Sequence, residues 1–292
     1  MSSFVIQSLN ALAFSMLLFF AAAGLSITFG LLNLANLAHG GFYMLGGYIA
    51  LATLAATQSF VLALLLAPLV LAAVGLIIER GFLRPLYQRD HLDQVLLTLG
   101  FAYLIWDFAN WIWGGTPHLL QPPAVLAGST RIMGHEYPVY RIGLLCGGLA
   151  LAAALIWVEA RTRIGAIIRA GVSDPQMLRA MGINVGLVFT LTFCFGAALA
   201  GLAGVVGGPV IGLYRDVDFE ILMLAIIVVV VGGLGSLRGT FASCLLVGLI
   251  DSFGKVYFPD FALVTVFVVM AVVLIVRPTG LYGVQRFNLA GT

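Results

Sequence analysis

Long apolar runs, separated by short polar breaks, make up most of this chain. Residues 1–78 contain no Asp, Glu, Lys or Arg, and the first charged side chain is Glu79. A membrane-spanning helix needs about 20 mostly apolar residues, so the charge-free part is long enough for about three spans. Polar residues at 33–41 and 57–59 divide it. The pattern predicts spans near residues 8–32, 42–57 and 60–80.

Six later apolar runs bring the predicted number of spans to about nine, within a range of eight to ten. They lie near residues 95–113, 141–158, 185–208, 220–236, 240–254 and 261–277. Irregular backbone at membrane depth needs protein or water around it, so we expect some spans to be broken or re-entrant. The pattern predicts an all-α, polytopic transmembrane helix bundle, with residues 1–292 in a single domain.

Composition agrees with a membrane protein and argues against several classes of function. Hydrophobic residues make up 62% of the chain and charged residues 9%, against roughly 25% charged in ordinary globular proteins. No GxxxxGK[ST] or HExxH motif occurs, and the histidines and cysteines are scattered. We therefore expect no catalytic site, metal site or bound cofactor on this chain, and no nucleic-acid partner.

Arginine is concentrated in residues 79–94 and 159–184. Short cytoplasmic loops hold the excess of positive charge, so both segments are predicted to be cytoplasmic. The basic residues then inside are Arg80, Arg84, Arg89, Arg161, Arg163, Arg169, Arg179, Arg238, Arg277 and Arg286, and those outside are Arg131, Arg141, Arg215 and Lys255. Nine spans would place the N-terminus outside and the C-terminus in the cytoplasm.

A short helix is predicted inside the basic segment 159–184. Asp174 suits the N-cap, because its side chain accepts a hydrogen bond from a free amide, and Pro175 suits the first helical position. Gly182 allows the left-handed turn that ends a helix. Such a helix, of about two turns, is unstable alone in water and must pack on something.

Met177, Leu178 and Met181 lie on one side of this short helix. We interpret them as a surface that fits a groove of a partner, because methionine side chains are flexible. Arg169 and its neighbours add positive charge. The alternative is that the arginines only fix topology and contact lipid headgroups, which leaves the two helix caps unexplained.

Polar side chains within the spans are candidates for a translocation pathway, because polar groups are costly in lipid. His39 beside two glycines suggests a broken helix, where exposed backbone groups can bind a zwitterionic substrate. The candidates are Asn33, Asn36, His39, Gly40, Gly41, Thr98 and Asp107. Hydrogen bonding between helices is the alternative for the asparagines. The alternative for Asp107 and Asp251 is a place near the outer boundary or a pair with Arg141 or Lys255, and we favour this alternative for Asp251.

Two outer loops are long enough to meet a partner. Residues 114–140 contain four prolines, which predict a stiff extended loop. Asp216, Asp218 and Glu220 form an acidic cluster that we hypothesise docks a binding protein by charge. The alternative is an ordinary solvated loop.

Small residues recur every four positions in the predicted span 185–208. Gly196, Ala200, Gly204 and Gly208 therefore share one helix face. This spacing favours tight helix packing over a dedicated dimer interface.

The basic segment resembles the cytoplasmic coupling segment of ABC importer permeases, in the form found in branched-chain amino acid permeases of the LivH type. The matching residues are Arg163, Gly165, Arg169, Ala170, Asp174, Gly182, Ile183 and Asn184. LNLANLAHGGFYMLGGYIA (32–50), VGGLGSLRGTFASCLLVGLID (231–251) and RPTGLYG (277–283) are similar to three further motifs of that family, in the same order. The chain departs from the family pattern at Leu34, Ile167 and Arg238.

This resemblance implies a multi-pass permease of the bacterial inner membrane that imports leucine, isoleucine and valine. It implies as partners two ATP-binding subunits that hold ATP and Mg²⁺, a second, LivM-like permease, and a periplasmic binding protein. The short helix would then dock in an ATP-binding subunit, with Gly165 and Gly171 letting the segment bend. The alternatives are a permease of the same family for urea or short amides, an ion-coupled transporter or channel, and a membrane scaffold.

Overall fold

The computed structural model describes residues 2–283, without the side chains of Ser2, Ser3, Ser173, Pro175, Gln176 and Leu263. Within these residues, seven helical segments are long and apolar enough to cross a membrane. They are α1 (Ser2–Leu32), α2 (Ala38–Thr57), α3 (Phe60–Ile78) with the π and 3-10 turns that extend it to Leu86, α4 (His91–Trp113), α5 (Val139–Arg161), α8 (Val185–Ile211) and α10 (Leu237–Tyr257). The all-α multi-pass architecture predicted from the apolar runs is confirmed.

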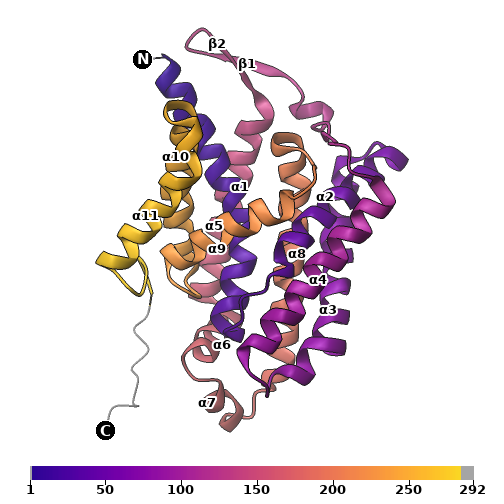
Figure 1. Cartoon of the computed structure of the whole chain (residues 1–292), viewed down its shortest axis with the longest axis vertical. Coiled ribbons are helices and arrows are strands. Elements are labelled where there is room, and N and C mark those ends of the chain that lie inside the picture. Colours follow the sequence, from indigo (N-terminus) through magenta and orange to yellow (C-terminus); the bar gives the residue numbers. More distant parts are fainter. Residues whose placement is uncertain (1, 284–292) are drawn as a thin grey trace.

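Two of the nine predicted spans are shorter helices, α9 (Val217–Gly232) and α11 (Ala262–Val276). Their 16 and 15 residues reach only about 24 Å at 1.5 Å per residue, less than the roughly 30 Å of a hydrocarbon core. Most side chains of α9 are buried, and the helix lies in the middle of the bundle (Figure 1). Protein therefore surrounds α9 where lipid surrounds a full-length span.

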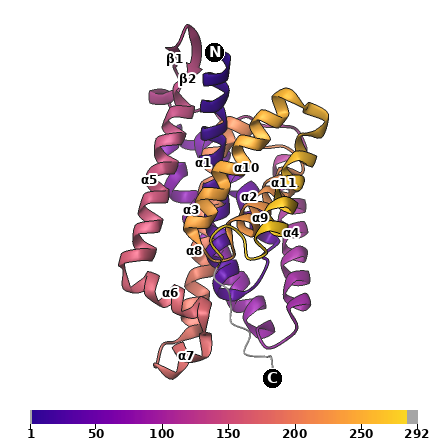
Figure 2. The same ribbon diagram turned by 90° about the vertical axis from the view of Figure 1, so that its left-hand side faces the viewer.

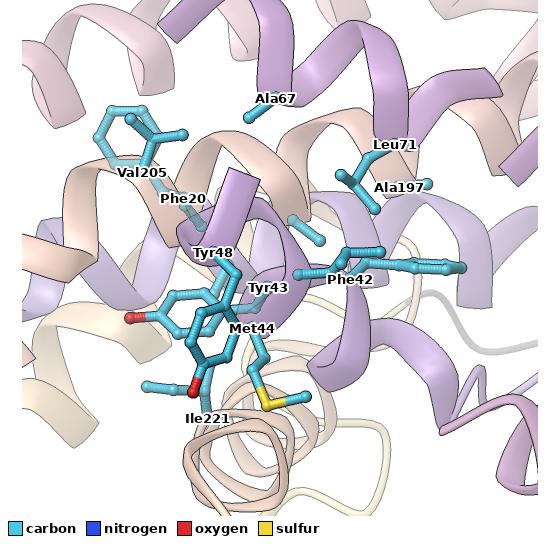
Figure 3. Close-up of a cluster of buried hydrophobic side chains, with 14 of the residues drawn as sticks. Phe20, Phe42, Tyr43, Met44, Tyr48, Ala67, Leu71, Ala197, Val205 and Ile221 are labelled. Carbon is cyan, nitrogen blue, oxygen red and sulfur yellow. The ribbon is translucent and has the colours of Figure 1, made fainter. Parts of the chain in front are cut away.

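Helix α2 is the centre of the largest cluster of buried side chains. Figure 3 shows Phe42, Tyr43, Met44 and Tyr48 of α2 among Phe20 of α1, Ala67 and Leu71 of α3, Ala197 and Val205 of α8, and Ile221 of α9. Phe42 also meets Phe193 of α8 edge to face, with 6.2 Å between the ring centroids. Side chains of these four helices thus pack around α2, and α4 also lies against it.

Glycines allow this close packing. A Cβ added to Gly46 would lie 2.4 Å from the carbonyl oxygen of Gly201, and one added to Gly204 would lie 2.0 Å from that of Tyr43. On the same face of α8, Gly196 packs against Gly24 of α1. The glycine face predicted for this span therefore packs inside the chain, as expected for tight helix packing.

The break between α1 and α2 begins where it was predicted but is shorter, because α2 starts at Ala38. Asn33 has a left-handed φ of 52°, which ends α1, and residues 33–36 have no regular structure. His39, Gly40 and Gly41 belong to the first turn of α2. The expectation of a helix broken at His39 was wrong, because the irregular backbone lies before this residue.

The polar connections lie at the two ends of the bundle. Strands β1 (Ser129–Ile132) and β2 (His135–Pro138) form an antiparallel hairpin at one end, with Thr130 opposite Tyr137. Helices α6 (Arg163–Ser173) and α7 (Pro175–Ala180) connect α5 to α8 at the other end (Figures 1 and 2). The extended loop predicted for 114–140 therefore contains a hairpin.

The two arginine-rich segments share one end of the molecule, as the charge distribution predicts, because Arg84 and Arg179 line the same cleft. Helix α1 begins at the hairpin end (Figure 1). Arg286, assigned to the inside from the sequence, lies outside the described residues.

Candidate functional site

The α7 segment has the N-terminal cap that its sequence predicts. The Oδ1 atom of Asp174 accepts a hydrogen bond from the backbone N–H of Met177 at 3.1 Å. This bond satisfies one of the free amides at the start of the helix. The side chain of Pro175 lies outside the described part of the chain, although its backbone forms the first position of α7.

The C-terminus of α7 has the paired hydrogen bonds of a Schellman motif. Gly182 has a φ of 80°, and its N–H donates to the carbonyl oxygen of Arg179 at 3.0 Å. The N–H of Ile183 donates to the carbonyl oxygen of Leu178 at 3.1 Å. These two bonds close the helix at the glycine predicted for this role.

The three apolar side chains of α7 do not form one exposed face. Met177 and Met181 are 61% and 69% exposed, whereas Leu178 is 2% exposed. The prediction that Leu178 joins a partner-facing surface was therefore wrong. Leu178 lies one position round the helix from Met177, and this turns it toward the bundle. It anchors α7, while the two methionines remain available to a partner.

Helix α6, which was not predicted, connects α7 to the rest of the bundle. Thr162 caps it by accepting a hydrogen bond from the N–H of Gly165 at 3.2 Å. A Cβ on Gly165 would lie 2.2 Å from the carbonyl oxygen of Glu159. Gly165 is therefore required by a close backbone contact, which differs from the bending role expected for it. Arg169, a predicted coupling residue, is exposed on α6.

Gly171 joins α6 to two other elements. A Cβ there would lie 2.5 Å from Cδ1 of Leu31 and 3.0 Å from Cδ1 of Leu178. Gly171 is helical, so its role is close packing and not flexibility. A packed path thus leads from Leu178 of α7, across Gly171 of α6, to Leu31 near the end of α1.

Beside α7 is a cleft of about 800 Å³ that sequence reasoning did not find. We call it the arginine cleft, because Arg84, in the 3-10 turn after α3, and Arg179 of α7 both line it. Glu79 was also missed. It is fully buried and accepts hydrogen bonds from Tyr87 Oη at 2.9 Å and Thr190 Oγ1 at 2.7 Å, which ties the segment carrying Arg84 to α8.

Several predicted pathway residues gather at the break between α1 and α2. Asn36 Oδ1 accepts a hydrogen bond from the N–H of Ala38 at 3.1 Å. Thr98 of α4 is buried, and its Oγ1 accepts a hydrogen bond from the N–H of Leu37 at 3.2 Å. Asn33 is exposed and lies 3.4 Å from His91, between Nδ2 and Nε2. Side chains of the break itself and of α4 thus stabilise this irregular backbone.

His39 is buried next to the break. Its Nε2–H donates to the carbonyl oxygen of Ala21 at 2.8 Å, and its Nδ1 has no hydrogen-bond partner among the described residues. Gly40 packs on α9, since a Cβ there would lie 2.1 Å from the carbonyl oxygen of Asp218, and Gly41 packs on Ile105 of α4. Asp107, by contrast, is exposed on α4 and does not line a passage inside this chain.

The predicted acidic cluster is divided between surface and interior. Asp216 and Glu220 are exposed, and the Glu220 carboxylate accepts a hydrogen bond from the hydroxyl of Tyr214. Asp218 is 1% exposed, because the first turn of α9 points it toward α2. The hypothesis that Asp218 contacts a docking protein is therefore wrong for this conformation. Asp251 pairs with Lys255 at 2.8 Å, which is one of the two partners considered for it from the sequence.

Known proteins resemble this chain over almost its whole length. A family model described as "Branched-chain amino acid transport system / permease component" matches residues 7–276. The high-affinity branched-chain amino acid transport system permease protein LivH of Escherichia coli K12 is 28% identical and is covered to 96%, as is this chain. The corresponding BraD of Pseudomonas aeruginosa is 30% identical, with 95% of both chains covered.

A similar fold occurs in the solved structure of PsaBC from Streptococcus pneumoniae in complex with Fab. The TM-score is 0.52 at 14% identity, and the match covers 91% of this chain and 89% of that chain. At this identity the likeness shows a shared fold. The match to the family model and the identity to BraD show membership of a family. The chain belongs to the family of permease components of branched-chain amino acid transport systems.

Proposed function

We propose that this chain is the transmembrane permease subunit of an ATP-driven ABC importer and translocates leucine, isoleucine and valine. Its family and its seven apolar helices make it a multi-pass membrane transport subunit. The names of LivH and BraD support the choice of substrate. The observation that carries the mechanism is the doubly capped α7, which presents Met177 and Met181 at one end of the bundle.

In the proposed mechanism, α7 docks in a groove of an ATP-binding subunit and moves with it. Displacement passes to α1 through Leu178, Gly171 and Leu31, because close-packed contacts transmit strain. It also passes to α8, which starts directly after α7 and is capped by Asn184, whose Oδ1 accepts from the N–H of Leu187 at 3.0 Å. ATP binding drives the change only by favouring one global state over the other.

The proposed assembly contains two ATP-binding subunits, a second, LivM-like permease and a periplasmic binding protein. ATP and Mg²⁺ bind to the ATP-binding subunits, and this chain holds no cofactor. We place the complex in the bacterial inner membrane, with the α7 end and the C-terminus in the cytoplasm. The positive charge of the two arginine-rich segments supports that orientation.

For the pathway, we propose that substrate passes the break between α1 and α2. A zwitterion needs polar partners in an apolar environment, and irregular backbone supplies amides and carbonyls. Asn33, Asn36, His39 and Thr98 cluster there. The packing of Gly40 and Gly41 against α9 and α4 makes the start of α2 sensitive to movements of those helices.

At the hairpin end of the bundle, opposite to α7, we propose that Asp216 and Glu220 dock the binding protein. Both side chains are exposed, and they lie near the hairpin end, since residue 213 pairs with His118 in the loop that leads to the hairpin. Complementary charge steers such encounters and weakens with salt.

Copurification tests the proposed function. The tagged chain is expressed with its second permease and untagged ATP-binding subunits. We expect the wild-type chain to retain the ATP-binding subunits, and the Asp174→Arg and Gly182→Trp variants to lose them. Asp216→Arg makes the same change of charge away from α7 and serves as the matched control. Intact assembly in both α7 variants would contradict the proposed role of α7.

A further inference from the structure

The arginine cleft is lined by two guanidinium groups, and none of its other described lining residues carries a carboxylate. Arg84 and Arg179 come from segments far apart in the sequence, and both are exposed. Neither forms an ion pair with any of the described residues. Two cations that line one cleft repel each other, and an anion that binds in the cleft relieves this repulsion.

Three side chains on the segments that form the cleft already accept hydrogen bonds through their oxygen atoms. Glu79 accepts from Tyr87 and Thr190, and Asn184 caps α8. Asp174 caps α7. Among the described residues that line the cleft, Arg84 and Arg179 are the ones with charged side chains.

The floor of the cleft adds to the positive potential. It is formed by the first turn of α8, and the Nη2 atom of Arg84 lies over it, 3.1 Å from where a Cβ of Gly186 would stand. Amides in the first turn of a helix carry partial positive charge. Glycine at this position leaves room for the guanidinium to remain against the helix.

The position of the cleft indicates which partner can supply an anion to it. Arg179 belongs to α7, and Ile183, in the turn that closes α7, also lines the cleft. Helix α7 lies at the extreme end of the bundle in both views (Figures 1 and 2). The cleft is thus continuous with the surface proposed to meet the ATP-binding subunit.

We infer that the arginine cleft receives an acidic side chain, Asp or Glu, of the ATP-binding subunit when α7 docks. This inference rests on the proposed function and adds a charged contact to it. Met177 and Met181 supply apolar contact, while Arg84 and Arg179 hold the carboxylate and fix the orientation of the docked subunit. Arginine suits this role because its planar guanidinium group matches the geometry of a carboxylate.

Charge reversal tests the inference in the complete permease complex, held in phosphatidylcholine nanodiscs. We expect Arg84→Glu and Arg179→Glu each to weaken the binding of the ATP-binding subunit about tenfold. Arg89→Glu changes an exposed arginine five residues from Arg84 that does not line the cleft, and it should leave the affinity near that of the wild type. High salt should weaken wild-type binding more than binding to the two cleft variants.

Cross-linking identifies the acid without relying on loss of binding. The chain contains a single lysine, Lys255, in the last turn of α10, near Gln7 at the other end of the bundle. Arg84→Lys and Arg179→Lys keep the charge and introduce an amine into the cleft. A carbodiimide should then form an amide bond from that amine to an Asp or Glu of the ATP-binding subunit, which mass spectrometry locates.

Three results would overturn the inference. The first is unchanged affinity in both reversals together with no cross-link. The second is an effect of the reversals that appears only when phosphatidylglycerol is added, which would assign the cleft to a lipid headgroup. The third is a wild-type complex that binds no ATP-binding subunit, and this result alone also removes the proposed function. If Asp174→Arg releases the subunit and the reversals do not, only the arginine cleft is refuted.

Discussion

Gly182 has a backbone conformation that most residues adopt only at a cost. Its φ of 80° closes α7, and a Cβ there would meet no atom within 4 Å. We therefore predict that Gly182→Ala destabilises the end of α7 through the backbone alone, by about 1 kcal/mol. Gly182→Asn should cost less, since asparagine tolerates this region. Exchange of the backbone amides of residues 182 and 183 measures the effect. Equal exchange in the wild type and the two variants would refute the prediction.

Leu178 and Met177 are adjacent in the sequence, but replacing them should affect different properties, namely stability and binding to the ATP-binding subunit. Leu178→Ala removes a buried side chain, and we expect it to destabilise the packing of α7 by about 2–5 kcal/mol. Met177→Ala removes an exposed one and should weaken the ATP-binding subunit's affinity without changing stability. Thermal unfolding of the purified chain and subunit affinity, measured side by side, separate the two effects. The same pair of changes in both variants would contradict the assignment.

For single residues, the sequence predicts roles that depend on near neighbours in the chain. Asp174 and Gly182 act within a few residues of themselves, so their spacing was sufficient to predict both caps. The burial of Leu178 and Asp218 depends on α6 and α2, which are remote in sequence, and no local pattern contains that information. The same reason explains why the sequence did not predict that Arg84 and Arg179 line one cleft.

Helix α2 depends on glycine contacts with α8. A Cβ on Gly46 would lie 2.4 Å from a backbone oxygen of Gly201, so Gly46→Ala must push the two helices apart. We predict a loss of about 1–3 kcal/mol in stability. Gly100 is the matched control, because it lies in α4 with no atom within 4 Å of an added Cβ. Gly100→Ala should be neutral or stabilising by up to about 1 kcal/mol, and equal thermal stability of both variants would be the contrary result.

Among the elements, length and hydrophobicity predicted the seven full-length spans well. The small-residue spacing in α8 predicted a packing face but not its partners, α1 and α2. Helix α6 was missed because its charged residues suggested a loop, although Thr162 could have indicated its N-cap. The hairpin was missed because prolines dominated the interpretation of 114–140, while Met133 and Gly134, with φ of 50° and 86°, form its two-residue turn.

For the molecule as a whole, the orientation in the membrane is directly testable. Met133 at the hairpin turn and Met181 after α7 are both strongly exposed and lie at opposite ends. In a background without the three native cysteines, we predict that an impermeant thiol reagent labels Met133→Cys in intact cells once the outer membrane is permeable. Met181→Cys should react only after the inner membrane is opened. The reverse order would invert the proposed topology.

The division of the acidic cluster gives a second prediction at this scale. Changing both Asp216 and Glu220 to lysine should lower the affinity for the binding protein severalfold at low salt, with a smaller effect at high salt. Asp218→Asn should leave this affinity unchanged, because its side chain is buried. Titration of the reconstituted complex with binding protein measures both, and a larger loss from Asp218→Asn would refute the assignment.

The most direct test of the central claim, that α7 couples ATP hydrolysis to import through this permease, is leucine uptake by proteoliposomes containing the complete complex. We expect uptake that requires ATP, Mg²⁺ and the binding protein. Replacing Met177 and Met181 together by alanine should leave the two permeases folded and paired but abolish ATP-driven uptake. Uptake at the wild-type rate in that double variant, or leucine uptake without ATP, would refute the coupling role of α7.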